Sequence, residues 1–174
     1  MPDASATTRQ LWLPLCLLTA CASDAPVTLQ IAGYGIIESD RVVMRIDKTS
    51  TVGAKRADAR SMQVAVTTER IPLRKGLSYG IAFRVMRAPT QEVQLKGVLR
   101  TSSPCLLKDS GKVVYHNDSV LTVRIGQLRH FGARIPASES ENHCIGEPQP
   151  GTDTFELWFE DQKLVERTFH VYRE

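Results

Sequence analysis

Three histidines could provide chemistry if the fold brought their segments together. His116, His130 and His143 lie in or beside predicted loops and short strands, and His170 lies near the C-terminus. Neutral imidazole nitrogens suit zinc or copper, so a loop cluster of the first three could bind a transition metal. The sequence has no H-E-x-x-H zinc motif and no phosphate-binding loop. We therefore predict no catalytic residue, no cofactor and no metal, with a site on the three loop histidines as the alternative.

The first 21 residues are organised like an export signal. One cation, Arg9, precedes an apolar run from Leu11 to Leu18, which is too short to span a bilayer. The end of the run, Leu18-Thr19-Ala20-Cys21, resembles the signal of bacterial lipoproteins. The resemblance implies cleavage before Cys21 and lipid on its thiol. Because Ala22 follows, it also implies transport to the outer membrane, facing the periplasm.

On this interpretation the chain has three parts. Residues 1–20 are a lipoprotein signal peptide, residues 21–26 a short tether, and residues 27–174 a single domain. One acyl chain binds a membrane only marginally, whereas two or more anchor it stably, so a multiply acylated Cys21 would be a lasting tether. The alternatives are a conventional secretory cleavage that leaves Cys21 an ordinary cysteine, and an N-terminal segment of the core.

The sequence has four cysteines, of which two remain for the domain. Cys16 leaves with the leader and Cys21 carries lipid, so Cys105 and Cys144 are left. In an oxidising compartment such a pair is most simply a disulfide. A redox-active or metal-binding pair is the alternative, because a histidine adjoins Cys144, although cysteine ligands usually occur at closer spacing.

This disulfide would join two regions that we predict to be long loops, Thr101 to Asp118 and Ala133 to Asp153. Closing a loop of this length stabilises the fold by about 4 kcal/mol on the chain-entropy model.

Length and charge place the mature chain among ordinary single domains. Removing 20 residues from 174 leaves 154, enough for one core. The net charge of +3 is a mild excess, and acids and bases alternate along the chain. The densest basic stretch, Lys55, Arg56 and Arg60, is interpreted as a solvated loop, with a patch for anionic glycan or lipid headgroups as the alternative. No feature supports a nucleic-acid partner.

The apolar residues of the mature chain recur with period two, which indicates strands. The clearest unit is a C-terminal hairpin, in which Phe155, Leu157 and Phe159 alternate with polar residues, a polar turn follows, and Phe169 and Val171 return. No segment predicts an amphipathic helix. The other candidate strands are Val27–Ile37, Val42–Asp47, Met62–Thr68, Tyr79–Val85, Val93–Leu99, Val113–Tyr115, Val120–Ile125 and Arg129–Ile135. The pattern predicts an all-β, immunoglobulin-like, two-sheet antiparallel β-sandwich with two long loops.

Three blocks of residues carry a resemblance over nearly the whole mature chain. They are Gly33-Tyr34-Gly35-Ile36 with Glu38; Thr68-Glu69-Arg70-Ile71-Pro72 with Gly76, Tyr79 and Gly80; and Pro150-Gly151 ahead of Phe155, Leu157, Lys163, Leu164, Phe169 and Val171. In order and spacing they resemble the bacterial domain-of-unknown-function family 3859. The resemblance implies an exported single domain with a β-sandwich fold, and it implies no reaction.

Several of these residues have a physical interpretation of their own. Gly33 and Gly35 indicate a bulge or a close backbone approach around Tyr34, and the segment from Ile71 to Gly76 indicates a strand exit and a tight turn. Tyr34 and Tyr79 are interpreted as buried anchors, with a ligand-stacking platform as the alternative.

Trp158 is the aromatic residue with the best prospect of a binding role. On strict alternation it faces away from Phe155, Leu157 and Phe159. It therefore lies either on an exposed face or under a covering loop, and an exposed tryptophan is a good binding anchor.

Together these features predict a lipid-tethered β-sandwich of the cell envelope that is not an enzyme. It would bind another envelope component, a protein or a glycan, through a sheet face or its loops. The alternative is a metal-binding or hydrolytic envelope protein that uses His116, His130 and His143.

Overall fold

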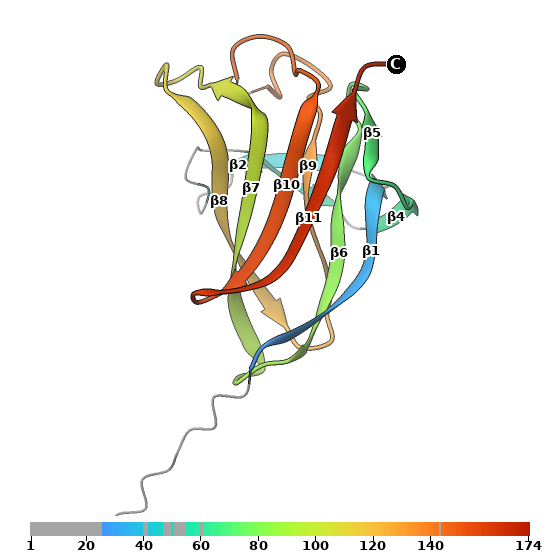
Figure 1. The fold of residues 1–174 in the computed structure, drawn as a ribbon, viewed down its shortest axis with the longest axis vertical. Coiled ribbons are helices and arrows are strands. Elements are labelled where there is room, and N and C mark those ends of the chain that lie inside the picture. Colours follow the sequence, from blue (N-terminus) through green and yellow to red (C-terminus); the bar gives the residue numbers. More distant parts are fainter. Residues whose placement is uncertain (1–25, 40–41, 47–49, 51–54, 60, 143) are drawn as a thin grey trace, which may run out of the picture.

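The structure is a computed structural model that describes residues 26–174 except 40–41, 47–49, 51–54, 60 and 143. Cys21 and His143 therefore lie outside the described residues. The described residues form strands, turns and loops (Figure 1). The strands are β1 (Thr28–Ser39), β2 (Val42–Ile46), β3 (Lys55–Ala59), β4 (Met62–Val66), β5 (Arg70–Pro72), β6 (Ser78–Arg87), β7 (Glu92–Leu106), β8 (Val113–Arg124), β9 (Leu128–Arg134), β10 (Gly151–Phe159) and β11 (Gln162–Tyr172).

Two sheets face each other. The four-stranded sheet has the order β4-β1-β6-β9, and the five-stranded sheet has the order β5-β11-β10-β7-β8. Neighbouring strands are antiparallel, apart from β5, which runs parallel to β11. Strands β2 and β3 form a separate two-stranded unit. This architecture confirms the predicted all-β, two-sheet sandwich.

One of the two predicted long loops was wrong in part. The region from Thr101 to Asp118 is mostly strand, because β7 continues to Leu106 and β8 begins at Val113. The apolar alternation stops there, but backbone pairing of Cys105 with Val114 continues the ladder beyond an irregularity. The second predicted long loop is present, since residues 135–150 separate β9 from β10.

The basic segment predicted as a solvated loop is also partly a strand. Lys55–Ala59 forms β3 and pairs with β2 over its whole length. The segment has no apolar alternation, and its pairing uses backbone groups that every residue type supplies. A search for alternating apolar residues therefore does not detect the pairing of β2 with β3.

Alternating side chains from both sheets fill the core. Ile81 and Phe83 of β6, and Phe155 and Leu157 of β10, are fully buried. Phe155 contacts Tyr79, Phe131 and Phe169 edge to face, with ring centroids 5.4–5.8 Å apart. Such ring pairs add about 0.5–1.5 kcal/mol each beyond the burial of their area.

Gly35 shows why the glycines around Tyr34 are needed. It has a φ of +126°, and a Cβ placed on it would lie 2.1 Å from the backbone oxygen of Val66. The pairing of β1 with β4 shifts register one residue further along, between Ile36 and Ile37. The predicted bulge with close backbone approach is therefore present.

The two ends of the sandwich differ in what they contain. Strand β1 begins at the lower end in Figure 1, beside the β6–β7 turn, and Thr28 pairs with Arg87 there. The 135–150 loop and the end of β11 lie at the upper end. Among the described residues, no helix has the length and apolar character needed to cross a bilayer.

Candidate functional site

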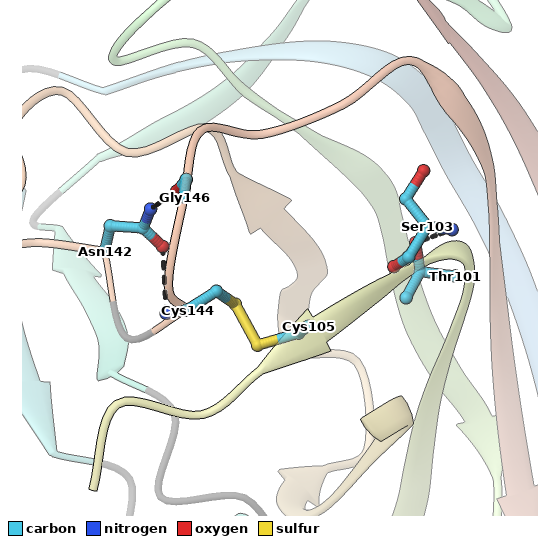
Figure 2. The surroundings of a disulfide bond; sticks show 6 residues. All are labelled: Thr101, Ser103, Cys105, Asn142, Cys144 and Gly146. Atoms are coloured by element: carbon cyan, nitrogen blue, oxygen red, sulfur yellow. Dashed lines mark hydrogen bonds between the residues drawn. A yellow bond between two sulfur atoms is a disulfide. The ribbon is translucent and has the colours of Figure 1, made fainter. Parts of the chain in front are cut away.

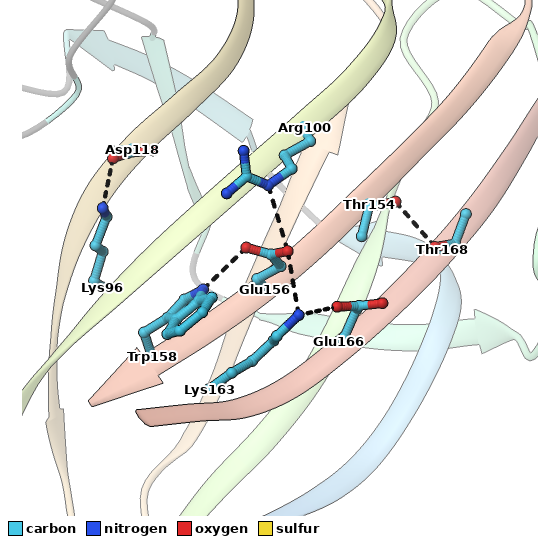
Figure 3. A network of polar contacts seen from close by, with 9 residues as sticks. All are labelled: Lys96, Arg100, Asp118, Thr154, Glu156, Trp158, Lys163, Glu166 and Thr168. Carbon is cyan, nitrogen blue, oxygen red and sulfur yellow. Dashed lines mark hydrogen bonds and ion pairs between the residues drawn. The ribbon is translucent and has the colours of Figure 1, made fainter. Parts of the chain in front are cut away.

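The outer face of the five-stranded sheet carries a polar network around Glu156 and Trp158 (Figure 3). Phe155 and Leu157 point into the core and are fully buried, so Glu156 and Trp158 point outward. Cross-strand neighbours from β7 and β11 extend the network on both sides. We call this surface the tryptophan face and define it by Lys96, Arg100, Glu156, Trp158 and Lys163.

Glu156 is the centre of the tryptophan face. Although it lies on the outer side of the sheet, it is only 5% exposed. Trp158 donates its indole N–H to Glu156 Oε2 at 3.0 Å, and Arg100 Nε lies 3.4 Å from Oε1. Lys163 Nζ lies 3.6 Å from Oε1 and 5.4 Å from the centroid of the Trp158 ring. One carboxylate therefore holds three neighbouring side chains in place.

These contacts decide the charge of Glu156. Burial acts to raise the pKa of its carboxyl, but hydrogen bonds from Trp158 and Arg100 and the charges of Arg100 and Lys163 outweigh burial and lower the pKa. Glu156 is thus ionised at neutral pH, and its oxygens are already occupied. A carboxylate of this kind is suited to organising a surface and poorly suited to proton transfer.

The face is continued by apolar and paired residues on β7 and β8. Val98 pairs with Glu156 on one side and with Asp118 on the other, and it is 3% exposed. Lys96 Nζ lies 2.8 Å from Asp118 Oδ2. Trp158 itself is half-buried among these neighbours. Its role as a binding anchor stays a prediction. In the structure its indole N–H is bonded to Glu156, and its ring lies against Lys163.

The candidate histidines are not gathered into one site among the described residues. His116 is exposed on β8, opposite Arg100, whereas His130 lies on β9 in the other sheet. Burial, and then the charge of Arg129, lowers the pKa of His130. The part of the chain that the structure describes holds no group of three His, Cys, Asp or Glu side chains placed to bind a metal ion.

The predicted disulfide between Cys105 and Cys144 is present (Figure 2). It ties the end of β7 to the 135–150 loop across a sequence separation of 39 residues. Asn142 supports this junction, because its Oδ1 accepts from the Cys144 N–H at 3.0 Å and its Nδ2 donates to the Gly146 carbonyl at 2.7 Å. The cysteines therefore have a structural role.

The segment Gly76-Leu77-Ser78-Tyr79-Gly80 matches the G-x-S-x-G pattern of hydrolases, a match that our sequence analysis missed. In hydrolases this motif places its serine on a sharp turn between a strand and a helix. Here Ser78 begins β6, and the chain continues as a strand to Arg87. Its hydroxyl lies 3.4 Å from an Arg134 N–H. The context of a nucleophile elbow is therefore missing.

A groove of about 1090 Å³ lies beside Ser78, between the ends of β1 and β4 and the β5–β6 turn. Its cations are already paired. Arg74 contacts Glu174 at 2.9 Å, Lys75 lies 4.0 Å from Glu147, and Arg134 lies 3.5 Å from Glu141. The groove therefore offers a ligand less charge than its composition suggests.

Sequence analysis also missed a buried polar pair inside the sandwich. Tyr79 of β6 is 4% exposed and donates its hydroxyl hydrogen to Asp153 of β10. Burial raises the pKa of Asp153, and hydrogen bonds from Tyr79 and Thr101 offset this only in part. The signal was available, because Asp153 has the same parity as the core residues Phe155 and Leu157.

Comparison with known proteins yields a structural likeness. No family model matches the chain, and no curated protein matches it. An immunoglobulin-like protein from Pseudomonas aeruginosa superimposes with a TM-score of 0.54 at 15% identity, covering 86% of this chain and 99% of that one. At this identity the likeness shows the fold alone. Membership of the domain-of-unknown-function family 3859 stays a prediction, and the chain is an immunoglobulin-like β-sandwich.

Proposed function

We propose that this chain is a non-catalytic binding module of the bacterial cell envelope, held there by lipid on Cys21. The immunoglobulin-like fold fits a structural or binding module. The lipid anchor is supported by the leader sequence ending in Leu18-Thr19-Ala20-Cys21.

One observation favours binding over catalysis, namely the arrangement of the tryptophan face. A tryptophan and an arginine, the residue types enriched at binding hot spots, lie on either side of a buried carboxylate that fixes both. Side chains held in advance lose less conformational entropy when a partner docks. The partner is another envelope component, a protein or a glycan.

The anchor is tested by the mass of the N-terminal peptide of the protein isolated from membranes. We expect a peptide that begins at Cys21 and carries the added mass of a diacylglyceryl group and an amide-linked acyl chain. A free Cys21 thiol, or a leader still attached, contradicts the anchor.

Binding through the tryptophan face is tested by photocross-linking in intact envelopes. A photoreactive residue replaces Gln94, which is exposed on β7 next to Lys96, and in a matched variant it replaces Gln63, which is exposed on β4 of the four-stranded sheet. We expect one discrete adduct from position 94, none from position 63, and loss of the adduct when Trp158→Ala is added. Equal adducts from both positions, or an adduct insensitive to Trp158, contradict the assignment of the face.

A further inference from the structure

We infer that the end of the sandwich where β1 begins rests on an anionic phospholipid surface. The inference rests on the proposed lipid anchor and adds two things to it, the orientation of the domain and the class of lipid that it contacts. We call this surface the tether end and define it by Arg84, Met86, Arg87, Arg124, Leu128 and Arg129.

The chain leaves the core at this end. Val27 is 3% exposed, and the next residue, Thr28, pairs with Arg87 at the end of β6. Cys21 precedes Val27 by six residues, and an extended chain spans at most about 3.3–3.6 Å per residue. The tether end is therefore within about 20 Å of any membrane that holds lipid on Cys21.

The tether end is cationic. Residues 84–92 and 122–130 contain four arginines and a single acid, Glu92, while residues 21–31, which include the tether, contain one acid, Asp24, and no cation. Glu92 pairs with Arg124 at 3.1 Å, where both side chains are about half exposed or more. This leaves an excess of two positive charges at this end, in a chain whose net charge is +3.

The two hairpins that carry these arginines are bonded to each other at this end. The Gly126 N–H donates to the Val85 carbonyl at 2.8 Å, and Arg84 donates to the Gly126 carbonyl at 2.8 Å. The Ile125 N–H donates to the Gln91 carbonyl at 3.1 Å. The β6–β7 and β8–β9 turns are thus joined, and their arginines lie around one end of the sandwich.

Exposed apolar side chains lie among the arginines. Met86 is 53% exposed and Leu128 is 37% exposed, and Leu128 pairs across strands with Arg84. Cations that contact headgroups beside apolar side chains that reach the acyl boundary are the combination found in proteins that lie on anionic membranes.

The opposite end has mixed charge. Lys75 is paired with Glu147, Arg74 with Glu174, and Lys108 with Glu139. The β10–β11 turn, which contains Glu160 and Asp161, is not at that end, because it lies in the lower half of Figure 1, above the β6–β7 turn. Charge complementarity and the position of the tether therefore select the same end.

The test is hydrogen–deuterium exchange on the lipidated protein in vesicles of phosphatidylcholine alone or with 30% phosphatidylglycerol. We expect amides in 86–91 and 125–128 to exchange several-fold more slowly on the anionic vesicles, and amides in 107–112 to be unchanged. Raising the ionic strength should remove the difference, because salt screens the attraction. Equal exchange on both kinds of vesicle overturns the inference.

A matched pair of charge reversals identifies the residues. Arg87→Glu changes the local charge by two, which should reduce the ratio of docked to undocked protein by on the order of tenfold or more. Arg74→Glu makes the same change at the opposite end and should leave protection intact. Equal effects of the two variants would mean that net charge acts without an oriented surface, which contradicts the inference.

Failure of the anchor is separable from failure of this inference. If the N-terminal peptide shows an unmodified Cys21, the anchor is wrong, and the same exchange contrast on added vesicles decides the lipid surface by itself. If Cys21 is lipidated and the anionic vesicles give no protection, the anchor holds and the proposed contact of the tether end with anionic lipid is wrong.

Discussion

Tyr79 and Asp153 join the two sheets of the sandwich, since the phenol of β6 donates its hydrogen to the carboxylate of β10 inside the core. The phenol ring also packs edge to face on Phe155 and Phe169. Burial, together with the charge and hydrogen bond of Asp153, raises the pKa of Tyr79 well above its usual value. The pair therefore holds its proton on the tyrosine across the ordinary pH range.

Removing the donor should cost more stability than removing the charge. Tyr79→Phe leaves the Asp153 carboxylate half-buried without its main partner, and we expect the free energy of unfolding to fall by about 1–3 kcal/mol. Asp153→Asn keeps an acceptor oxygen for the phenol and should cost less at pH 7. Urea denaturation of both variants measures this, and a Tyr79→Phe variant as stable as the parent protein argues against the pair.

Asp153 and Glu156 should respond to acid in opposite directions. The pKa of Asp153 is raised from 3.8, so the folded state takes up a proton first, and its contribution to stability rises as the pH falls through the raised value. The pKa of Glu156 is lowered from 4.5, so its contribution is present above that value and is lost as the pH falls through the lowered one.

The two variants that test this are Asp153→Asn and Glu156→Gln, followed by thermal or urea unfolding from pH 7 to pH 3. The cost of Asp153→Asn relative to the parent protein should grow as the pH falls, because only the parent protein gains stability when Asp153 takes up its proton. Glu156→Gln should cost about 1–3 kcal/mol at pH 7 and progressively less in acid. Parallel pH profiles for both variants would contradict these directions.

The disulfide should contribute strongly to stability. Replacing Cys105 and Cys144 together by serine opens a loop that spans 39 residues, and we expect a loss of about 4 kcal/mol on the chain-entropy model. The measurement is the free energy of unfolding with and without reductant. Reductant should lower the stability of the parent protein and leave the double serine variant unchanged.

Gly97 should be required because the absence of a side chain there leaves room for the ring of Phe131. A Cβ at this position would lie 2.8 Å from the ring of Phe131, which reaches across from the other sheet. We expect Gly97→Ala to cost about 1–3 kcal/mol, as overpacking of a core does. In a double-mutant cycle, Phe131→Leu should relieve part of this cost, and strict additivity would show that the two positions do not interact.

Sequence patterns identified the elements whose side chains alternate between core and solvent. The hairpin of β10 and β11 and the inner strand β6 were predicted because their apolar residues recur every second position over long runs. Strand β3 and the far half of β7 have no such recurrence and are held by backbone pairing. A pattern search depends on the alternation of side chains, so it could not detect strands that pair through their backbones without such alternation.

The candidate site was only partly foreseeable for a related reason. Alternation places Trp158 on the outer face, but it cannot show that Glu156 is almost fully covered there by side chains from β7 and β11. That burial depends on which strands become neighbours, and β7 lies far from β10 in sequence. The Tyr79–Asp153 pair depends in the same way on how the two sheets face each other.

The position of β11 within its sheet has a consequence for how the protein is made. It is the last strand of the sandwich to be synthesised, yet it lies between β5 and β10, and its Phe169 is fully buried. The core therefore cannot close until residues 162–172 have left the ribosome. Such non-local pairing also folds slowly. Until the whole of β11 is available, a chain with this topology leaves the apolar faces of β5 and β10 without the strand that lies between them.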